Sequence, residues 1–439
     1  MKEQRSNPDR RRVLHALSGI AIGTSMFQRA LADQTARTLT TVTMTPARQD
    51  DSLEPTAEMI ANAEWVAGIQ LTDEQRTTVA AAIRRVVLQC EQIRSASVSY
   101  SDIPALRFDP EMGVADRNRI LRKPEWLLTD EVARVPSDDS DNSPTPDNPA
   151  FASIHQLGRW LREGQTSSVR LTSYFLQRLR DADPKLLTVV NFTEELAQQQ
   201  ALRADQELAE GKDRGPLHGI PWGAKDLIAV PGTPTTWGAP QFREQVLHET
   251  ATVAAKLEQA GAVLVAKLSL GALAMGDQWY GGQTRNPWNR EQGSSGSSAG
   301  PGAAVAAGLV PFAIGSETMG SIISPSRRCG VTGLRPTFGR VSRAGCMALS
   351  WSMDKIGPMA RHVDDCGLVF HAIHGADPAD PTSVDRWFEW PVKAELSNVR
   401  VGFVTSAPMT PPEERAAEIL RKLGVTLIPV QLPSEPSPS

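Results

Sequence analysis

The spacing of apolar residues predicts two helices in the first quarter of the chain. Residues 55–66 have apolar positions at helical intervals, which is typical of an amphipathic helix. Thr72-Asp73-Glu74-Gln75 then has the pattern of a capping box, in which the threonine and glutamine side chains satisfy free backbone N–H groups. We expect the second helix to reach about Cys90.

Helices and short β-branched runs alternate after residue 150. Ser153-Ile154-His155-Gln156 is another capping box, and glycines close several of the helical runs that follow. We expect strands over 186–192, 262–266, 399–404 and 425–432, a strand followed by a turn over 220–230, and helices over 194–210, 252–260 and 413–423. This alternation predicts an α/β fold with helices on both faces of a sheet.

The first residues have the pattern of an export signal. Asp9-Arg10-Arg11-Arg12 precedes a modest apolar stretch, and Ala30-Leu31-Ala32 supplies the small residues that a signal peptidase requires. We interpret residues 1–32 as a twin-arginine signal, which directs the protein to the periplasm. If the signal is not used, the protein stays in the cytoplasm.

Two polar segments divide the remainder. Residues 33–53 are rich in threonine, and residues 136–149 (PSDDSDNSPTPDNP) have no apolar side chain apart from proline, as expected of a linker or long surface loop. We predict a region over 33–150 that holds the leader, the N-terminal helices and the linker, followed by one α/β domain over 151–439.

Composition excludes several classes of protein. The 439 residues contain 46 Lys+Arg and 50 Asp+Glu, which is not the balance of a basic nucleic-acid binder. No apolar run approaches the roughly 18 residues of a membrane-spanning helix, so we expect no membrane contact after signal removal. The cysteines are too scattered for a disulfide framework. His371 and His374 lack an accompanying carboxylate motif, and we expect no metal site.

The centre of the chain is rich in glycine and serine. Gly293-Ser294-Ser295-Gly296-Ser297-Ser298-Ala299-Gly300 leads into an apolar run over 303–314, and Gly315-Ser316-Glu317-Thr318-Met319-Gly320-Ser321 follows. Such a stretch is most often a flexible linker. Here it lies inside a continuous α/β pattern, which favours a loop whose backbone approaches another group closely. It is no phosphate-binding loop, because no GK[ST] follows the glycines.

Two motifs of serine enzymes occur by themselves. Gly296-Ser297-Ser298-Ala299-Gly300 fits the nucleophile elbow, with Ser298 attacking and His362 and Asp364 as partners. An elbow follows a buried strand, however, and the preceding segment is polar and contains Pro287. Ser352-Met353-Asp354-Lys355 matches SxxK, but the chain has no KTG to accompany it.

A longer series of motifs carries a third interpretation. In order, the chain contains Gly219-Ile220-Pro221 with Lys225-Asp226, Asn286-Pro287-Trp288, the Gly/Ser-rich loop, Gly315 to Ser321, Cys329-Gly330, Gly333-Leu334-Arg335-Pro336-Thr337 and Gly339-Arg340-Val341-Ser342. Over about 153–432 this series closely resembles the amidase signature family. The resemblance implies a mixed central sheet covered by helices on both faces, and no cofactor.

The resemblance also implies a catalytic triad. Matched motif by motif, Lys225 is the base, Ser297 is a bridging serine held on a cis peptide bond, and Ser321 is the nucleophile. The backbone of Thr318, Met319 and Gly320 would form the oxyanion hole. Gly296 and Ser298 would lie in the loop that meets the substrate.

The residue types suit this chemistry. A serine needs a base to attack an amide, and a lysine with a reference pKa of about 10.4 serves only if its site keeps it neutral. Burial lowers a lysine pKa by up to about 3 to 5 units, and Lys225 lies in a largely uncharged stretch. Asp226 would point to the opposite face of an extended segment.

Two residues near the nucleophile differ from the family pattern. Glu317 replaces an aspartate and Ile323 replaces an arginine, so we expect apolar packing in place of a polar contact. Met319 replaces a glycine that contributes only its backbone. The oxyanion donors survive if this residue has an ordinary φ, and its bulk would narrow the pocket.

We predict an exported amidase that cleaves a small-molecule carboxylic amide through an acyl-enzyme. Family members continue beyond the strand expected over 425–432, so the C-terminal part of the fold is expected to be missing here. One alternative is a protein like the glutamine-hydrolysing subunit that amidates misacylated transfer RNA. Another is an inactive truncated remnant. A homodimer is compatible with the sequence.

Overall fold

The computed structural model describes residues 55–67, 69–95, 144–388, 390, 396–404 and 409–431. The predicted export signal, the polar leader, most of the predicted linker and the last eight residues lie outside this range. The chain divides into two compact units, of which the larger contains the whole central sheet. None of the described helices is long and apolar enough to cross a membrane.

The N-terminal helices form as the sequence predicts. Helix α3 spans Ala57–Ala67 and α4 spans Asp73–Ser95, so α4 extends beyond the expected end at Cys90. The capping box of α4 is present, because Thr72 and Gln75 exchange two backbone-to-side-chain hydrogen bonds. An ion pair of 2.7 Å between Arg76 Nε and Glu64 Oε1 joins the two helices.

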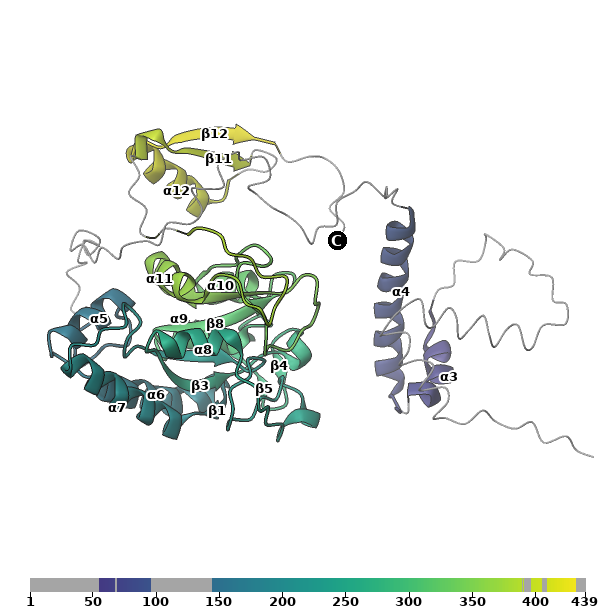
Figure 1. The fold of residues 1–439 in the computed structure, drawn as a ribbon. Helices are drawn as coiled ribbons and strands as arrows, with labels where there is room; N and C mark the ends of the chain where they lie inside the picture. The colour runs from purple at the N-terminus through teal and green to yellow at the C-terminus, as the bar shows by residue number, and fades with distance from the viewer. Residues whose placement is uncertain are drawn as a thin grey trace, which may run out of the picture. The chain divides into compact units, whose positions relative to one another are not determined.

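A mixed sheet of six strands forms the centre of the larger unit (Figure 1). The strand order is β1-β3-β2-β8-β10-β9, in which β3, β2 and β8 run parallel and the outer pairs are antiparallel. The strands are β1 (Val189–Phe192), β2 (Pro221–Lys225), β3 (Val263–Leu268), β8 (Phe312–Glu317), β9 (Thr332–Gly333) and β10 (Lys355–Ala360). The mixed α/β sheet expected from the sequence is confirmed.

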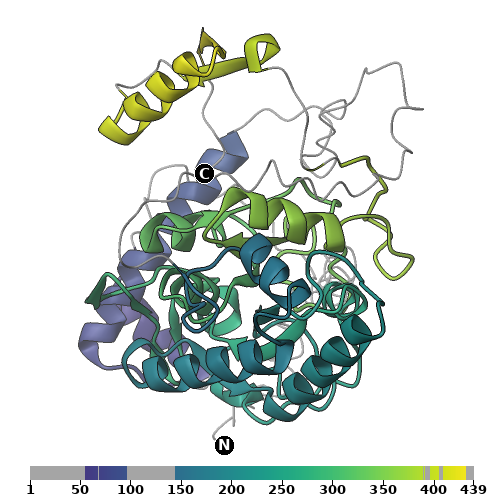
Figure 2. The same cartoon turned by 90° about the vertical axis from the view of Figure 1, so that its left-hand side faces the viewer.

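Helices cover both faces of this sheet. Side chains alternate along a strand, so in β8 Phe312 and Ile314 join one apolar cluster while Ala313 joins the other. The first cluster contains several residues each of α5 (Ile154–Arg162), α8 (Thr252–Gln259) and α11 (Val363–Ile373), together with Leu171. Residues of three more helices pack in the second, namely α6 (Ser168–Leu186), α7 (Glu194–Ala209) and α9 (Ala299–Ala306). Figure 2 shows this unit from the side of α5, α6 and α7.

The remaining elements are short. Two small hairpins precede the Gly/Ser-rich loop, formed by β4 (Gln278–Trp279), β5 (Gly282–Gln283), β6 (Arg285–Asn286) and β7 (Asn289–Gly293). Helix α10 (Ile323–Cys329) follows the predicted nucleophile, and single 3-10 turns are η5 (Pro240–Phe242), η6 (Ala272–Ala274) and η7 (Leu396–Asn398). Near the C-terminal end, β11 (Arg400–Val404) pairs with β12 (Thr426–Val430), and α12 (Pro411–Lys422) connects them.

The strand predicted over 186–192 begins later than expected. Helix α6 continues to Leu186, and Leu187 adopts the left-handed conformation with φ of 54°. The Asp183 carboxylate accepts the N–H groups of Thr188 at 2.6 Å and Val189 at 2.8 Å. These contacts satisfy the backbone just after the helix, so β1 starts only at Val189.

Candidate active site

Lys225 occupies the last position of β2 and is fully buried. Its Nζ donates to three hydroxyl oxygens, those of Ser297 at 2.8 Å, Ser316 at 2.9 Å and Ser298 at 3.1 Å. The carbonyl oxygen of Ser316 lies at 3.3 Å. Among the described residues, no carboxylate forms an ion pair with this amine. Lys225 is therefore a buried amine surrounded by neutral oxygen atoms.

The Gly/Ser-rich loop brings Ser297 to the lysine. The Gly296-Ser297 peptide bond is cis, as the resemblance implies, and Ser297 is almost completely buried. A Cβ atom on Gly296 would lie only 1.8 Å from the carbonyl oxygen of Gly276, so this position requires glycine. The prediction of a closely approaching loop, rather than a flexible linker, is confirmed.

Ser298 is neither at an elbow nor exposed to a cleft. It precedes α9 and is fully buried; its hydroxyl group accepts from Lys225 and donates to the Ser316 carbonyl oxygen at 3.0 Å. The nearest preceding strand, β7, is mostly exposed rather than buried. The Ser298 hydroxyl group therefore helps to hold the lysine, and its predicted place in the substrate loop stays a prediction.

The predicted nucleophile lies in the turn between β8 and α10. The Ser298 N–H donates to the Ser321 carbonyl oxygen at 3.0 Å, which ties this turn to the Gly/Ser-rich loop. Ser321 is partly exposed, and within the described part of the chain its hydroxyl group has no hydrogen-bond partner. The Lys225–Ser297 contact is therefore formed, whereas no direct hydrogen bond from Ser297 to Ser321 is present.

Four consecutive backbone donors lie at and just before Ser321. Across the described ranges, the N–H groups of Thr318, Met319, Gly320 and Ser321 donate to no protein acceptor. Gly320 has φ of 104°, a conformation that suits glycine. Met319 is not among the residues of positive φ, so it meets the condition of an ordinary φ set in the sequence analysis. Free N–H groups in a turn provide the donor set of an oxyanion hole.

The substitutions at Glu317 and Ile323 have a different effect from the one predicted. Glu317 is buried, and its Oε2 accepts the N–H groups of Ile322 at 2.8 Å and Ile323 at 2.9 Å. Ile323 is 47% exposed and Met319 is 75% exposed. The polar contact is thus replaced by another polar contact rather than by apolar packing, and the Met319 side chain points toward solvent instead of filling a pocket.

Burial determines the protonation of Lys225. Removal from water lowers its pKa from 10.5 to about 7, while the carboxylates of Asp354 and Glu317 oppose this effect from a distance. Asp226 points away, as predicted, and forms an ion pair of 2.8 Å with Lys267. A large fraction of Lys225 is consequently neutral near pH 7 and can accept a proton.

The SxxK motif does not form a Ser–Lys pair. The Ser352 hydroxyl group lies 3.4 Å from that of Ser350, whereas Lys355 Nζ donates to the Thr318 carbonyl oxygen at 2.8 Å. His371 and His374 have ring centroids 5.7 Å apart. In the described ranges, no group of three His, Cys, Asp or Glu side chains is arranged to hold a metal ion.

Sequence reasoning did not identify Ser316 as part of the site. It is a buried polar residue within the otherwise apolar first five positions of β8, and a buried hydroxyl group requires a partner. Ser316 also borders a cavity of about 220 Å³, which is lined further by Met347, Trp351, Asp354 and Ile356. Another cavity, of about 500 Å³, lies among Phe151, Arg178, Lys185 and Trp288 and contains none of the predicted site residues.

Comparison with known proteins gives consistent relatives. The chain is 40% identical over 289 residues to the glutamyl-tRNA(Gln) amidotransferase A subunit of Roseiflexus sp. (strain RS-1), covering 63% of this chain and 59% of the relative. The same subunit from Coxiella burnetii is 38% identical over 293 residues. The chain thus spans about three fifths of the length of these curated relatives.

Solved structures agree with this result. The native peptide amidase of Stenotrophomonas maltophilia superimposes with a TM-score of 0.59 at 34% identity, over 65% of this chain and 63% of that chain. A fatty acid amide hydrolase gives a TM-score of 0.59 at 27% identity, over 66% and 55%. The sequence pattern of the amidase family matches residues 170–438, and this chain therefore belongs to that family.

Proposed function

We propose that the protein hydrolyses a carboxylic amide to an acid and an amine or ammonia, with Ser321 as nucleophile, Ser297 as proton relay and Lys225 as general base. The observation that carries the proposal is the buried Lys225 amine, which has hydroxyl and carbonyl oxygens around it and a pKa of about 7. A lysine in this state accepts a proton at neutral pH, which an ion-paired lysine does not.

The proposed steps use the Lys225–Ser297 contact and require Ser297 to meet Ser321 when substrate is bound. Ser321 Oγ attacks the carbonyl carbon; its proton passes to Ser297 Oγ, whose own proton passes to Lys225 Nζ. The free N–H groups of Met319, Gly320 and Ser321 stabilise the resulting oxyanion, and each such donor is typically worth about 2.7 to 4 kcal/mol in the transition state. The protonated lysine then returns a proton through Ser297 to the departing nitrogen.

An acyl-enzyme remains after the C–N bond breaks. A water molecule attacks its carbonyl carbon and gives a proton back along the same route to Lys225. The collapse of this second tetrahedral intermediate releases the carboxylic acid and restores the Ser321 hydroxyl group. Ser297 suits the relay because a hydroxyl group both donates and accepts.

The substrate we propose is a small, non-peptide or peptide-like primary amide. The similarity to peptide amidase at 34% identity supports this class. A second candidate, hydrolysis of glutamine to supply ammonia, is favoured by the 40% identity to the A subunit of the amidotransferase. The two differ in whether glutamine is the preferred amide.

Ammonia release from purified full chain tests the proposal. The panel contains a C-terminal peptide amide, an aromatic carboxamide and free glutamine, with Ser321→Ala as the inactive control. Faster release from the first two supports an amidase, and preferential glutamine hydrolysis supports the second candidate. No release from any of them by folded protein would contradict both.

We also propose that residues 1–32 direct export. Replacing Arg10, Arg11 and Arg12 together by lysine should leave the protein in the cytoplasm, because the signal depends on a pair of adjacent arginines. Arg5→Lys is the matched control. Equal export of all three proteins would contradict the assignment.

A further inference from the structure

Thr318 is the first residue after β8. Two consecutive residues, Asp354 and Lys355, hold its hydroxyl group and its carbonyl oxygen. The Thr318 hydroxyl group donates to Asp354 Oδ1. Lys355 Nζ donates to the Thr318 carbonyl oxygen at 2.8 Å. Lys355 reaches this oxygen because it begins β10 and pairs with Glu317, the last residue of β8.

The contact with the carbonyl oxygen also sets the direction of an oxyanion donor. A peptide group is planar and trans, so the Thr318 C=O and the Met319 N–H point in opposite directions within one plane. Fixing the oxygen against Lys355 therefore fixes the N–H of Met319, which is free of protein acceptors. A cation on the oxygen also polarises the peptide group and strengthens its N–H as a donor.

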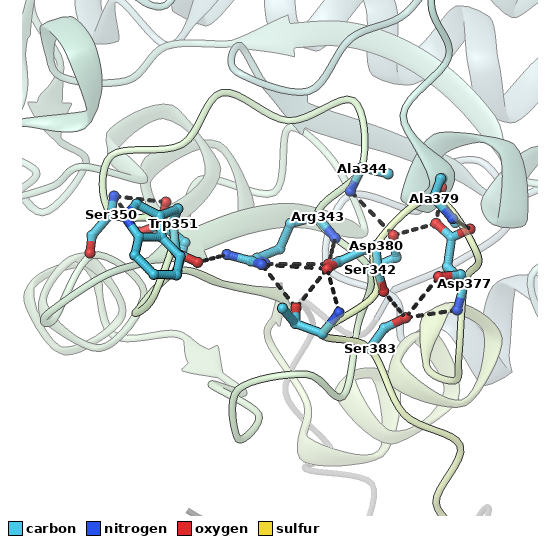
Figure 3. A network of polar contacts seen from close by, with 12 residues as sticks. Ser342, Arg343, Ala344, Ser350, Trp351, Asp377, Ala379, Asp380 and Ser383 are labelled. Carbon is cyan, nitrogen blue, oxygen red and sulfur yellow. Dashed lines mark hydrogen bonds and ion pairs between the residues drawn. The ribbon is translucent and has the colours of Figure 1, made fainter. Parts of the chain in front are cut away.

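Asp354 is itself held firmly. Its Oδ2 accepts the N–H of Leu349 at 2.8 Å and that of Ser350 at 3.1 Å. Figure 3 shows how the surrounding loop is fastened: the Arg343 guanidinium group donates to the Trp351 carbonyl oxygen and to Asp380. Asp354 is nearly buried at 7% exposure, so its carboxylate forms a fixed support for Thr318.

We propose that Lys355 and Asp354 are positioning residues that hold Thr318 so that the Met319 N–H points at the oxyanion. This proposal rests on the proposed hydrolysis at Ser321. It assigns a role to Asp354 and Lys355, the last two residues of the SxxK motif, although this motif does not form a Ser–Lys pair. Neither residue touches the reacting atoms; both act through the Thr318–Met319 peptide group.

Two pairs of variants distinguish the hydrogen bonds of Lys355 and Thr318 from the volume of their side chains. Lys355→Met removes the ammonium group and Lys355→Arg retains a donor; Thr318→Val removes the hydroxyl group and Thr318→Ser retains it. Losing one oxyanion donor typically lowers kcat by about 10²- to 10³-fold, and for a displaced donor we expect a loss of about 10- to 100-fold. KM should change by less than about threefold, and Arg and Ser should restore most of kcat. Lys212→Met, at an exposed lysine paired with Glu210, is the matched control.

Hydrogen–deuterium exchange of Ile322 and Ile323, whose N–H groups are hydrogen-bonded to Glu317 in the same turn, gives a readout independent of turnover. Faster exchange in Lys355→Met and Thr318→Val than in their conservative partners would support the positioning role. This result together with an inactive native chain would leave the positioning role intact and contradict only the proposed hydrolysis. An active chain whose kcat and exchange are unchanged in both variants would overturn the positioning role and retain the hydrolysis.

Discussion

Two lysines on adjacent strands of the central sheet are both fully buried, yet their surroundings differ. Lys225 at the end of β2 contacts only hydroxyl and carbonyl oxygens. Lys267 on β3 lies 2.8 Å from Asp226 Oδ1, and its Nζ also donates to Thr235 Oγ1 at 2.9 Å. Burial lowers the pKa of both, but at Lys267 the Asp226 carboxylate opposes the effect at contact distance.

This difference shows what makes a buried lysine a base. Burial alone disfavours the ammonium ion, and a carboxylate in contact restores it. Neighbouring residues 225 and 226 point to opposite faces, so Asp226 supports Lys267 and leaves Lys225 without a counter-ion. We infer that Lys225 provides the chemistry and that Lys267 holds the fold.

Removing the Lys225 amine gives the largest expected effect. Lys225→Met should lower kcat/KM by about 10²- to 10⁴-fold, the typical contribution of general base catalysis. The melting temperature should stay the same or rise, since the variant no longer buries an unpaired amine. Steady-state kinetics and thermal unfolding of the same preparation measure both. A variant that is less stable but keeps its activity would show that Lys225 supports the fold rather than catalysis.

Lys267→Met should act on stability instead. It leaves Asp226 as an uncompensated buried charge, and breaking such a pair typically costs about 3 to 5 kcal/mol. Urea unfolding measures the loss, and the double variant Lys267→Met, Asp226→Leu should recover much of it. Unchanged stability in the single variant would show that this pair does not support the fold.

A smaller change tests the neutral surroundings of Lys225. Ser316→Ala removes one of its three hydroxyl partners. This partner stabilises the ammonium group that forms when Lys225 accepts a proton, and a hydrogen bond to a charged group contributes about 1.5 to 3 kcal/mol. We expect kcat/KM to fall about 10- to 100-fold without loss of folding. Thr77→Ala in α4 deletes a hydroxyl group of the other compact unit and serves as the control. Equal effects of both variants would argue against a role for Ser316.

Asp365 extends the comparison to an acid. Its carboxyl group is buried, one oxygen accepts the Ile154 N–H at 3.0 Å, and among the described residues it forms no ion pair. Burial raises its pKa from 3.8 to about 7. The folded state therefore retains a proton that the unfolded chain has lost, so this group's contribution is fully present below about pH 4 and is lost as pH rises to about 7.

The change in unfolding free energy with pH provides the measurement for Asp365. One retained proton corresponds to at most about 1.4 kcal/mol of unfolding free energy per pH unit. Asp365→Asn should be less sensitive than the native chain between pH 5 and pH 8, as followed by urea unfolding. Identical slopes for the two proteins would mean that Asp365 titrates normally in the folded state.

The sequence predicts local features better than it predicts contacts between distant side chains. Capping boxes and the alternation of helix and strand are encoded within a few residues. The ion pair of Lys267 with Asp226 is not, since it joins residues 41 positions apart, with Asp226 just after β2 and Lys267 in β3. Ser316 was missed for the same reason, because its importance depends on the register of β8 beside β2.

The effect of the substitutions at Glu317 and Ile323 could not be predicted from the sequence either. The expectation of apolar packing at Ile323 treated the lost arginine as the only partner of the acidic residue. In the structure, Glu317 reaches two backbone N–H groups at the start of α10, which a longer carboxylate side chain can do. Such a contact depends on the path of the turn, and the composition of the motif does not specify that path.

In the proposed mechanism, the neutral Lys225 amine activates Ser321. The rate of labelling by a fluorophosphonate between pH 5 and pH 9 tests this, with the labelled peptide mapped and Lys225→Met in parallel. We expect an adduct on Ser321, a rate that rises with pH around a midpoint of about 7, and no labelling of the variant. An adduct on Ser298, or a rate on Ser321 that is independent of both pH and Lys225, would contradict this mechanism.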